Sequence, residues 1–253
     1  MSGHSKWSTI KRKKGAADAK RGQLFTKLTR EITVSAKEGG GDPDSNFRLR
    51  LAVQRARIEN MPAENIQRAI QRGSGMSGDG VTYEEITYEG YGPHGVATLV
   101  QSLTDNRNRT VAEVRAIFTK MGGSLSEAGS VGWMFESRGL ITIEPKAGQD
   151  ADEITLMAID AGAEDVSVDD EGNVEIVTSY EDLKRVQEAF ASQGLNVTNA
   201  ETTMIPKTTM ALEDKDIEQA LRMVERLEDL DDVQTVYTNL DLSEADALMA
   251  SMS

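Results

Sequence analysis

The sequence predicts an α+β protein, in which a basic N-terminal bundle of three helices precedes two α/β domains. Three observations support this fold class. Up to residue 72, apolar side chains recur every three or four positions, as in amphipathic helices. From residue 81 onward, short β-rich runs alternate with helical segments. The sign of the charge also changes between these two parts, from basic to strongly acidic.

The N-terminal part contains three segments with helical periodicity. A first helix is predicted over residues 18–37, and Gly39 and the glycines after it end the pattern. A second helix is predicted over residues 45–59, with Asp44 as its N-cap. A third, short helix has Pro62 in its first turn, where the missing N–H of proline is tolerated. Each helix has one apolar stripe, so the three are expected to form a small bundle.

The remaining sequence predicts two α/β domains. Strands over residues 81–89 and 96–104 flank a Gly/Pro turn, and a capping box from Thr110 to Glu113 opens the next helix. Residues 140–204 then follow the order β-α-β-β-α-β of a ferredoxin-like unit. A last helix and strand, up to residue 238, have no partner there and are expected to return to the first hairpin. The predicted domains are residues 1–75, residues 80–130 together with 206–240, and an inserted domain of residues 131–205.

Several classes of function are disfavoured by composition. The chain has no Cys, so disulfides and thiolate chemistry are excluded, and no apolar run approaches the roughly 18 residues that span a bilayer. We therefore expect a cytoplasmic protein that does not enter the membrane. Only two His are present and no nucleophile or nucleotide-binding motif occurs, so neither an enzyme nor a bound cofactor is expected. The paired Asp231 and Asp232 are interpreted as solvated charge at a helix end, with a hard-cation site as the alternative.

The charge distribution favours nucleic acid as a partner. Residues 1–72 hold 16 Lys and Arg against 7 Asp and Glu, whereas residues 73–253 hold 12 against 35. Clustered cations bind phosphates by releasing counterions, and Trp7 in the N-terminal arm can stack on a base. We call the basic N-terminal part, residues 1–75, the head, and the acidic remainder of the chain the body. The alternatives to nucleic-acid binding are that the basic surface of the head is merely solvated, or that the head docks on the acidic body of the same chain. The candidate nucleic-acid-binding residues in this head are Lys6, Trp7, Lys11, Arg12, Lys13, Lys14, Lys20, Arg21, Lys27, Arg30, Arg48, Arg50, Arg55 and Arg57.

A second candidate site is the polar segment from Asp105 to Thr110. Arg107 and Arg109 are expected just before a helix N-terminus, where backbone N–H groups and cations can converge on one phosphate. Asn and Asp are also common in ordinary turns, and an Arg here can instead pair with nearby acids. Both interpretations stay open from the sequence.

The motifs along the chain resemble those of the YebC/PmpR family of probable transcriptional regulators, which is related to a mitochondrial translational activator of cytochrome c oxidase. The resemblance covers nearly the whole chain. It implies a helical N-terminal domain and two α/β domains in a cytoplasmic protein. The matching motifs include Gly3-His-Ser-Lys-Trp7, Asp18-Ala-Lys-Arg-Gly22, Gly40-Gly-Asp-Pro43, Asn60-Met-Pro62, Tyr88-Glu-Gly-Tyr-Gly-Pro93, Leu103-Thr-Asp-Asn-Arg-Asn-Arg-Thr110 and Gly129-Ser-Val131.

Three functions remain after the resemblance is considered. The first is a transcriptional regulator that binds DNA through the basic head, as the resemblance implies for some members of the family. The second is a translation factor that contacts ribosomal RNA through the same head. The third is an adaptor whose acidic body binds a basic protein. The resemblance also gives more weight to the arm at Gly3–Trp7 and to the segment Asp105–Thr110.

Overall fold

The computed structural model describes residues 18–76, 82–169 and 172–242, with side chains from residue 21 onward. The chain forms two compact units. One comprises Glu136–Ile205, and the other is formed by the segments on either side of it. The boundaries of three separate domains stay a prediction.

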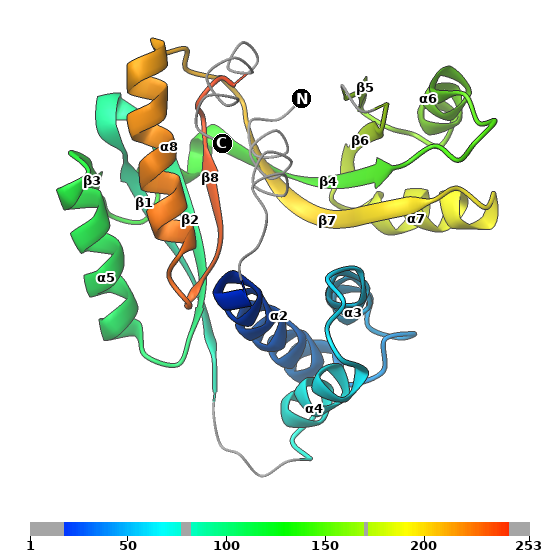
Figure 1. Cartoon of the computed structure of the whole chain (residues 1–253), viewed down its shortest axis with the longest axis horizontal. Helices are drawn as coiled ribbons and strands as arrows, with labels where there is room; N and C mark the ends of the chain where they lie inside the picture. Colours follow the sequence, from blue (N-terminus) through cyan, green and yellow to red (C-terminus); the bar gives the residue numbers. More distant parts are fainter. Residues whose placement is uncertain (1–17, 77–81, 170–171, 243–253) are drawn as a thin grey trace. The chain divides into compact units, whose positions relative to one another are not determined.

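The N-terminal part forms the expected three helices (Figure 1). They are α2 (Asp18–Gly39), α3 (Phe47–Ile58) and α4 (Ala63–Gly73). Leu28, Ile32 and Leu49 are buried in the core that they share. The predicted cap of α3 was wrong, because Asn46 rather than Asp44 accepts a hydrogen bond from the backbone N–H of Leu49 at 3.1 Å. Asn46 is itself buried and also donates to the carbonyl oxygens of Ser35 and Gly40, so it joins the end of α2 to the start of α3.

The first sheet lies in the same unit as these helices. Its strands are β1 (Glu84–Tyr91), β2 (Ala97–Thr104), β3 (Ser124–Leu125) and β8 (Val233–Thr238), in the order β3-β1-β2-β8. Two helices, α5 (Arg107–Lys120) and α8 (Asp214–Glu228), lie side by side on one face of the sheet (Figure 1). Their apolar side chains and those of the sheet form one core around Val100, Phe118 and Leu221. As predicted, the last helix and strand return to the first hairpin, where β8 pairs with β2.

The second unit has the expected ferredoxin-like order of elements. These are β4 (Phe135–Ile143), α6 (Ala151–Asp160), β5 (Asp165–Val168), β6 (Val174–Ser179), α7 (Leu183–Ser192) and β7 (Val197–Pro206). The sheet order β5-β6-β4-β7 places the first and third strands of the unit at its centre. None of the helices in the described part of the chain is long and apolar enough to cross a membrane.

The start of α5 differs from the sequence prediction. The helix begins at Arg107, three residues before the predicted capping box, and Asn106 is its N-cap. The side chain of Asn106 accepts a hydrogen bond from the backbone N–H of Arg109 at 3.1 Å. Thr110 is buried inside the helix. Both arginines of the segment therefore lie in the first turn of α5 and not in the loop before it.

Candidate functional site

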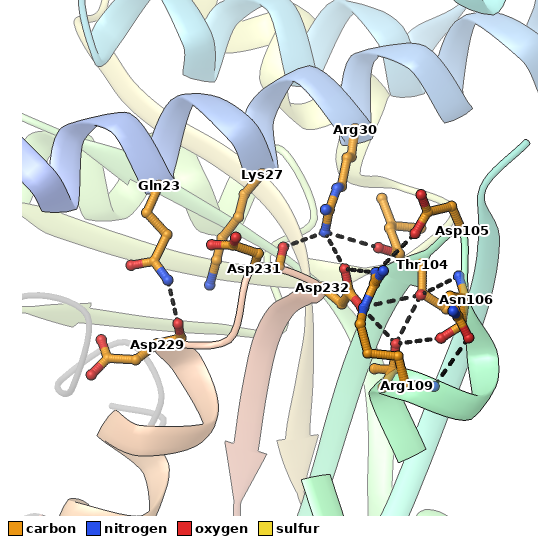
Figure 2. Close-up of polar contacts among 12 residues, drawn as sticks. Gln23, Lys27, Arg30, Thr104, Asp105, Asn106, Arg109, Asp229, Asp231 and Asp232 are labelled. Atoms are coloured by element: carbon orange, nitrogen blue, oxygen red, sulfur yellow. Dashed lines mark hydrogen bonds and ion pairs between the residues drawn. The ribbon is translucent and has the colours of Figure 1, made fainter. Parts of the chain in front are cut away.

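A buried carboxylate lies where the ends of β2, α5 and α8 meet. Asp232, immediately before β8, has an exposed fraction of only 2%. Its oxygens accept hydrogen bonds from the hydroxyl groups of Thr110 at 2.6 Å and Thr104 at 3.1 Å, and from the guanidinium of Arg109 at 2.7 Å (Figure 2). Its backbone carbonyl accepts from the N–H of Leu103 at 2.8 Å. A carboxylate as buried as this is stable only with such a set of partners.

The expectation of solvated charge at Asp231 and Asp232 was therefore half wrong. Asp231 is exposed, but Asp232 is buried. Both residues lie in the turn that precedes β8, and only the second of them is turned into the protein. Within the described residues, no group of three or more acidic or His side chains is placed to hold a metal ion.

The surroundings of Asp232 favour its ionised form. Burial alone would raise its pKa, but the hydrogen bonds from Thr110 and Arg109 and the charges of Arg30 and Arg109 outweigh burial. Together they hold the pKa of Asp232 below its ordinary value. The same contact raises the pKa of Arg109 above its ordinary value, because the hydrogen bond to Asp232 favours the charged guanidinium.

The depressed pKa predicts a pH-dependent contribution to stability. Because the folded state binds the proton less readily than the unfolded state, this stability is present above the ordinary pKa of about 3.9 and is lost as the pH falls below it. The difference in free energy of unfolding between the wild type and Asp232→Asn should therefore be constant from pH 7 to 5 and shrink below about pH 4. Urea unfolding at each pH measures it. A difference that grows on acidification would contradict this account.

Helix α2 docks directly on this carboxylate. Arg30 donates from Nη1 to Oδ1 of Asp232 at 2.6 Å and to the backbone carbonyl of Asp231 (Figure 2). The side chain of Arg30 is 12% exposed, and its guanidinium lies 5.6 Å from the centre of the Tyr83 ring. Asp232 is therefore shared by two arginines, one from its own α/β fold and one from the N-terminal helices.

The same helix also caps the C-terminal end of α8. Lys27 donates to the backbone carbonyl of Glu228. Gln23 donates to the backbone carbonyl of Asp229 (Figure 2). The last carbonyls of a helix have no partner within it and carry its negative dipole end. A cation and an amide from α2 satisfy these carbonyls across more than two hundred residues of sequence.

These contacts come from a single stripe of α2. At 3.6 residues per turn, Gln23, Lys27 and Arg30 lie on one face, and the buried Val34 continues it. Leu28 and Ile32, which build the core of the helical bundle, lie on the opposite face. Lys27 and Arg30 therefore follow the alternative in which the basic head docks on an acidic part of the same chain.

Two other predicted cations of the head are also engaged within the protein. Arg48 forms ion pairs with Glu31 at 3.0 Å, Glu38 at 2.7 Å and Glu85 at 3.0 Å. Burial alone would lower the pKa of Arg48, but the charge and hydrogen bonds of Glu31 and Glu85 outweigh it and raise the pKa above its ordinary value. Arg50 donates to the backbone carbonyls that precede α3, those of Pro43 and Asp44.

The remaining predicted cations are exposed or lie outside the described residues. Arg21, Arg55 and Arg57 are exposed on α2 and α3, and Arg21 and Arg57 form no ion pair with another described residue. Their contact with nucleic acid stays a prediction. The arm lies outside the described residues with Lys6, Trp7, Lys11, Arg12, Lys13 and Lys14, as does the side chain of Lys20.

The two arginines of the second candidate site have different surroundings. Arg107 is exposed in the first turn of α5. Arg109 pairs with Asp232 at 2.7 Å and with Asp105 at 2.8 Å. The guanidinium of Arg109, which was expected to bind a phosphate, is thus paired with carboxylates of the chain itself. Binding of an anion by Arg107 stays a prediction.

The structure contains a loop, residues 129–132, whose backbone N–H groups bind a carboxylate, and the sequence analysis did not predict it. The carboxylate of Glu89 accepts hydrogen bonds from the backbone N–H groups of Gly129 at 2.7 Å, Val131 at 2.8 Å and Gly132 at 2.7 Å. Burial raises the pKa of Glu89, but these backbone donors outweigh it and hold the pKa below its ordinary value. The motif Gly129-Ser-Val131 was the available signal. It gives no indication that a glutamate forty residues earlier fills the loop.

Comparison with known proteins places this chain among close relatives. The family model described as "TACO1/YebC protein N-terminal domain" matches residues 5–76, and that described as "TACO1/YebC second and third domain" matches residues 83–240. A protein of Chloroflexus aurantiacus named "Probable transcriptional regulatory protein" is 59% identical over 245 residues, covering 96% of each chain. A protein of Moorella thermoacetica with the same name is 53% identical over 246 residues, covering 97% of each.

A solved structure is similar to this chain in both fold and sequence. The crystal structure of a conserved hypothetical protein from Aquifex aeolicus has a TM-score of 0.81 and 42% sequence identity, and the match covers 88% of this chain and 91% of that one. The family models together span both α/β parts and the helical head, and the curated relatives match over almost their full length. The chain belongs to the TACO1/YebC family.

Proposed function

We propose that this protein is a non-catalytic regulator of transcription that binds duplex DNA through its N-terminal head. The observation that carries the proposal is the charge distribution. Sixteen basic residues lie within the first 72, and the rest of the chain is strongly acidic. Arg21 on α2 and Arg55 and Arg57 on α3 are exposed and add to the cations of the arm. The names of the relatives, probable transcriptional regulatory proteins, support the same function.

The head is suited to binding phosphates rather than to reading bases. Of the cations predicted to bind nucleic acid, Lys27, Arg30 and Arg48 are held within the protein by carbonyls and carboxylates. The arm and the three exposed arginines supply positive charge for contacts with phosphates. Contacts of this kind position a protein on a duplex and carry little sequence information.

The proposal predicts a specific dependence of affinity on salt. If about 4 to 6 phosphates are contacted, the slope of log K against log salt concentration should be roughly −4 to −5 on duplex DNA. Fluorescence anisotropy with the full chain and a labelled duplex measures it, and a single-stranded RNA of equal length is the comparison. An affinity that does not depend on salt would contradict the proposal. Much tighter binding to the RNA would favour the translation factor instead.

A further inference from the structure

The docking of α2 engages two partly buried cations of the head with oxygen atoms of the same chain. Lys27 donates to the carbonyl of Glu228 and Arg30 donates to Asp232 at 2.6 Å. Arg30 is 12% exposed in this position. The surface that receives them resembles a phosphate group in its chemistry, because it consists of carbonyl and carboxylate oxygens at the negative end of a helix.

The contacts of Gln23, Lys27 and Arg30 are polar and lie on the face of α2 away from the bundle core, and so they are separable from the folding of the helical bundle. The bundle is held together by the opposite face of α2, through Leu28 and Ile32. Opening the docked stripe leaves this core intact. On the other side, Asp232 keeps the hydroxyl groups of Thr104 and Thr110 and the guanidinium of Arg109. Each side thus retains its own partners when the two separate.

The docked arrangement also leaves one polar atom without a partner. The Nε of Arg30 is buried and forms no hydrogen bond with any described residue. A buried donor that lacks an acceptor destabilises the state in which it occurs. A phosphate can accept from Nε and a terminal nitrogen of one guanidinium together, as bidentate arginine–phosphate pairs do. The docked state therefore does not satisfy Arg30 as fully as a phosphate would.

We propose that the C-terminal residue of α8 and the turn that follows it, from Glu228 to Asp232, form an internal competitor that occupies Lys27 and Arg30 until nucleic acid displaces it. This inference rests on the proposed function, because it assumes that the head binds nucleic acid. Docking then weakens nucleic-acid binding, and by linkage nucleic-acid binding weakens docking by the same factor. Lys27 and Arg30 then contact phosphates only when a nucleic acid of sufficient charge displaces the docked segment.

A reversible lock tests the competition. The chain has no Cys, so Gln23→Cys with Asp229→Cys introduces the only two thiols, at positions whose residues are hydrogen-bonded in the docked state. A short cross-linker that contains a disulfide holds the docked state and is cleaved by reductant. We expect the cross-linked protein to bind a labelled duplex more weakly than the same sample after reduction. If Lys27 and Arg30 both fail to contact phosphates in the cross-linked form, its affinity for the duplex should be lower by a factor on the order of 10 to 60 at 0.1 M salt.

The salt dependence and the cross-linking rate give two further readouts. Loss of two phosphate contacts should make the slope of log K against log salt shallower by about 1.8 in the cross-linked form. Added duplex should slow cross-linking of the reduced protein. The single variants Gln23→Cys and Asp229→Cys, treated in the same way, control for the chemistry.

Each outcome separates this inference from the function on which it rests. If neither the cross-linked nor the reduced protein binds nucleic acid, the proposed function fails. If both bind with equal affinity and equal slope, the function stands and the competition is wrong. If the two thiols do not cross-link within one chain, the docked state is not formed in solution and the competition is equally wrong.

Discussion

Replacing Asp232 with alanine should lower the free energy of unfolding by about 3–5 kcal/mol, because it breaks a buried ion pair and leaves the partner charge behind. Arg30 is 12% exposed and would keep its charge without the carboxylate that balances it. The hydroxyl groups of Thr104 and Thr110 would also lose their acceptor inside the protein. Asp232→Asn should cost less, since its amide oxygen keeps part of the hydrogen bonding.

The neighbouring aspartate offers a matched control. Asp231 is exposed, and Arg30 contacts its backbone carbonyl rather than its carboxylate. Asp231→Ala removes the same charge from the same segment and should change the free energy of unfolding by no more than about 0.5 kcal/mol. Urea unfolding of both variants, followed by circular dichroism, measures the comparison. Equal effects of the two substitutions would show that Asp232 is not the structural centre described above.

A second large effect is expected in the N-terminal arm. Substituting its four clustered cations together with alanine should lower the affinity for duplex DNA by roughly 10³-fold at 0.1 M salt, if each contacts one phosphate. The salt slope should also become shallower by about 3.6, since each lost contact removes about 0.9. The residues to be changed are Lys11, Arg12, Lys13 and Lys14.

The control for the arm keeps the same net charge. Four exposed cations of the acidic body are changed to alanine instead, so that both variants go from a net charge of −14 to −18. If the arm contacts phosphates directly, this second variant should retain most of the affinity and the original slope. Equal losses in the two variants would mean that only the overall charge matters. The control residues are Lys120, Lys184, Lys215 and Arg222.

The sequence predicted the elements of the fold well because their signals are local. The periodicity of Leu28 and Ile32 defines the inner face of α2, and residues 233–238 were predicted as a strand at the bounds that β8 has. The errors concern helix N-caps, where two nearby residues can each cap the same helix. Asn46 rather than Asp44 caps α3, and Asn106 rather than Thr110 caps α5. Asn, Asp and Thr all favour N-cap positions, so the residue type alone does not decide which of them caps the helix.

The site was harder to predict because its contacts are distant in sequence. Arg30 and Asp232 are 202 residues apart, and nothing near either residue indicates the other. The sequence indicated that the head is basic and the body acidic, and left open whether the two meet. It did not show that Gln23, Lys27 and Arg30 share one stripe with a structural role, because polar residues at that spacing usually face solvent.

The pairing of β2 with β8 has a consequence for the order in which the protein folds during its synthesis. Thr98 pairs with Thr238, so one side of β2 has no neighbour until almost the whole chain has been made. The ferredoxin-like unit, which lies between them in sequence, is complete before that moment. Until β8 arrives, β2 is an open edge whose unpaired N–H and C=O groups can attract other strands. The acidic segment that holds Lys27 and Arg30 emerges at the same late stage, so a nascent chain exposes its basic head before the chain can cover it.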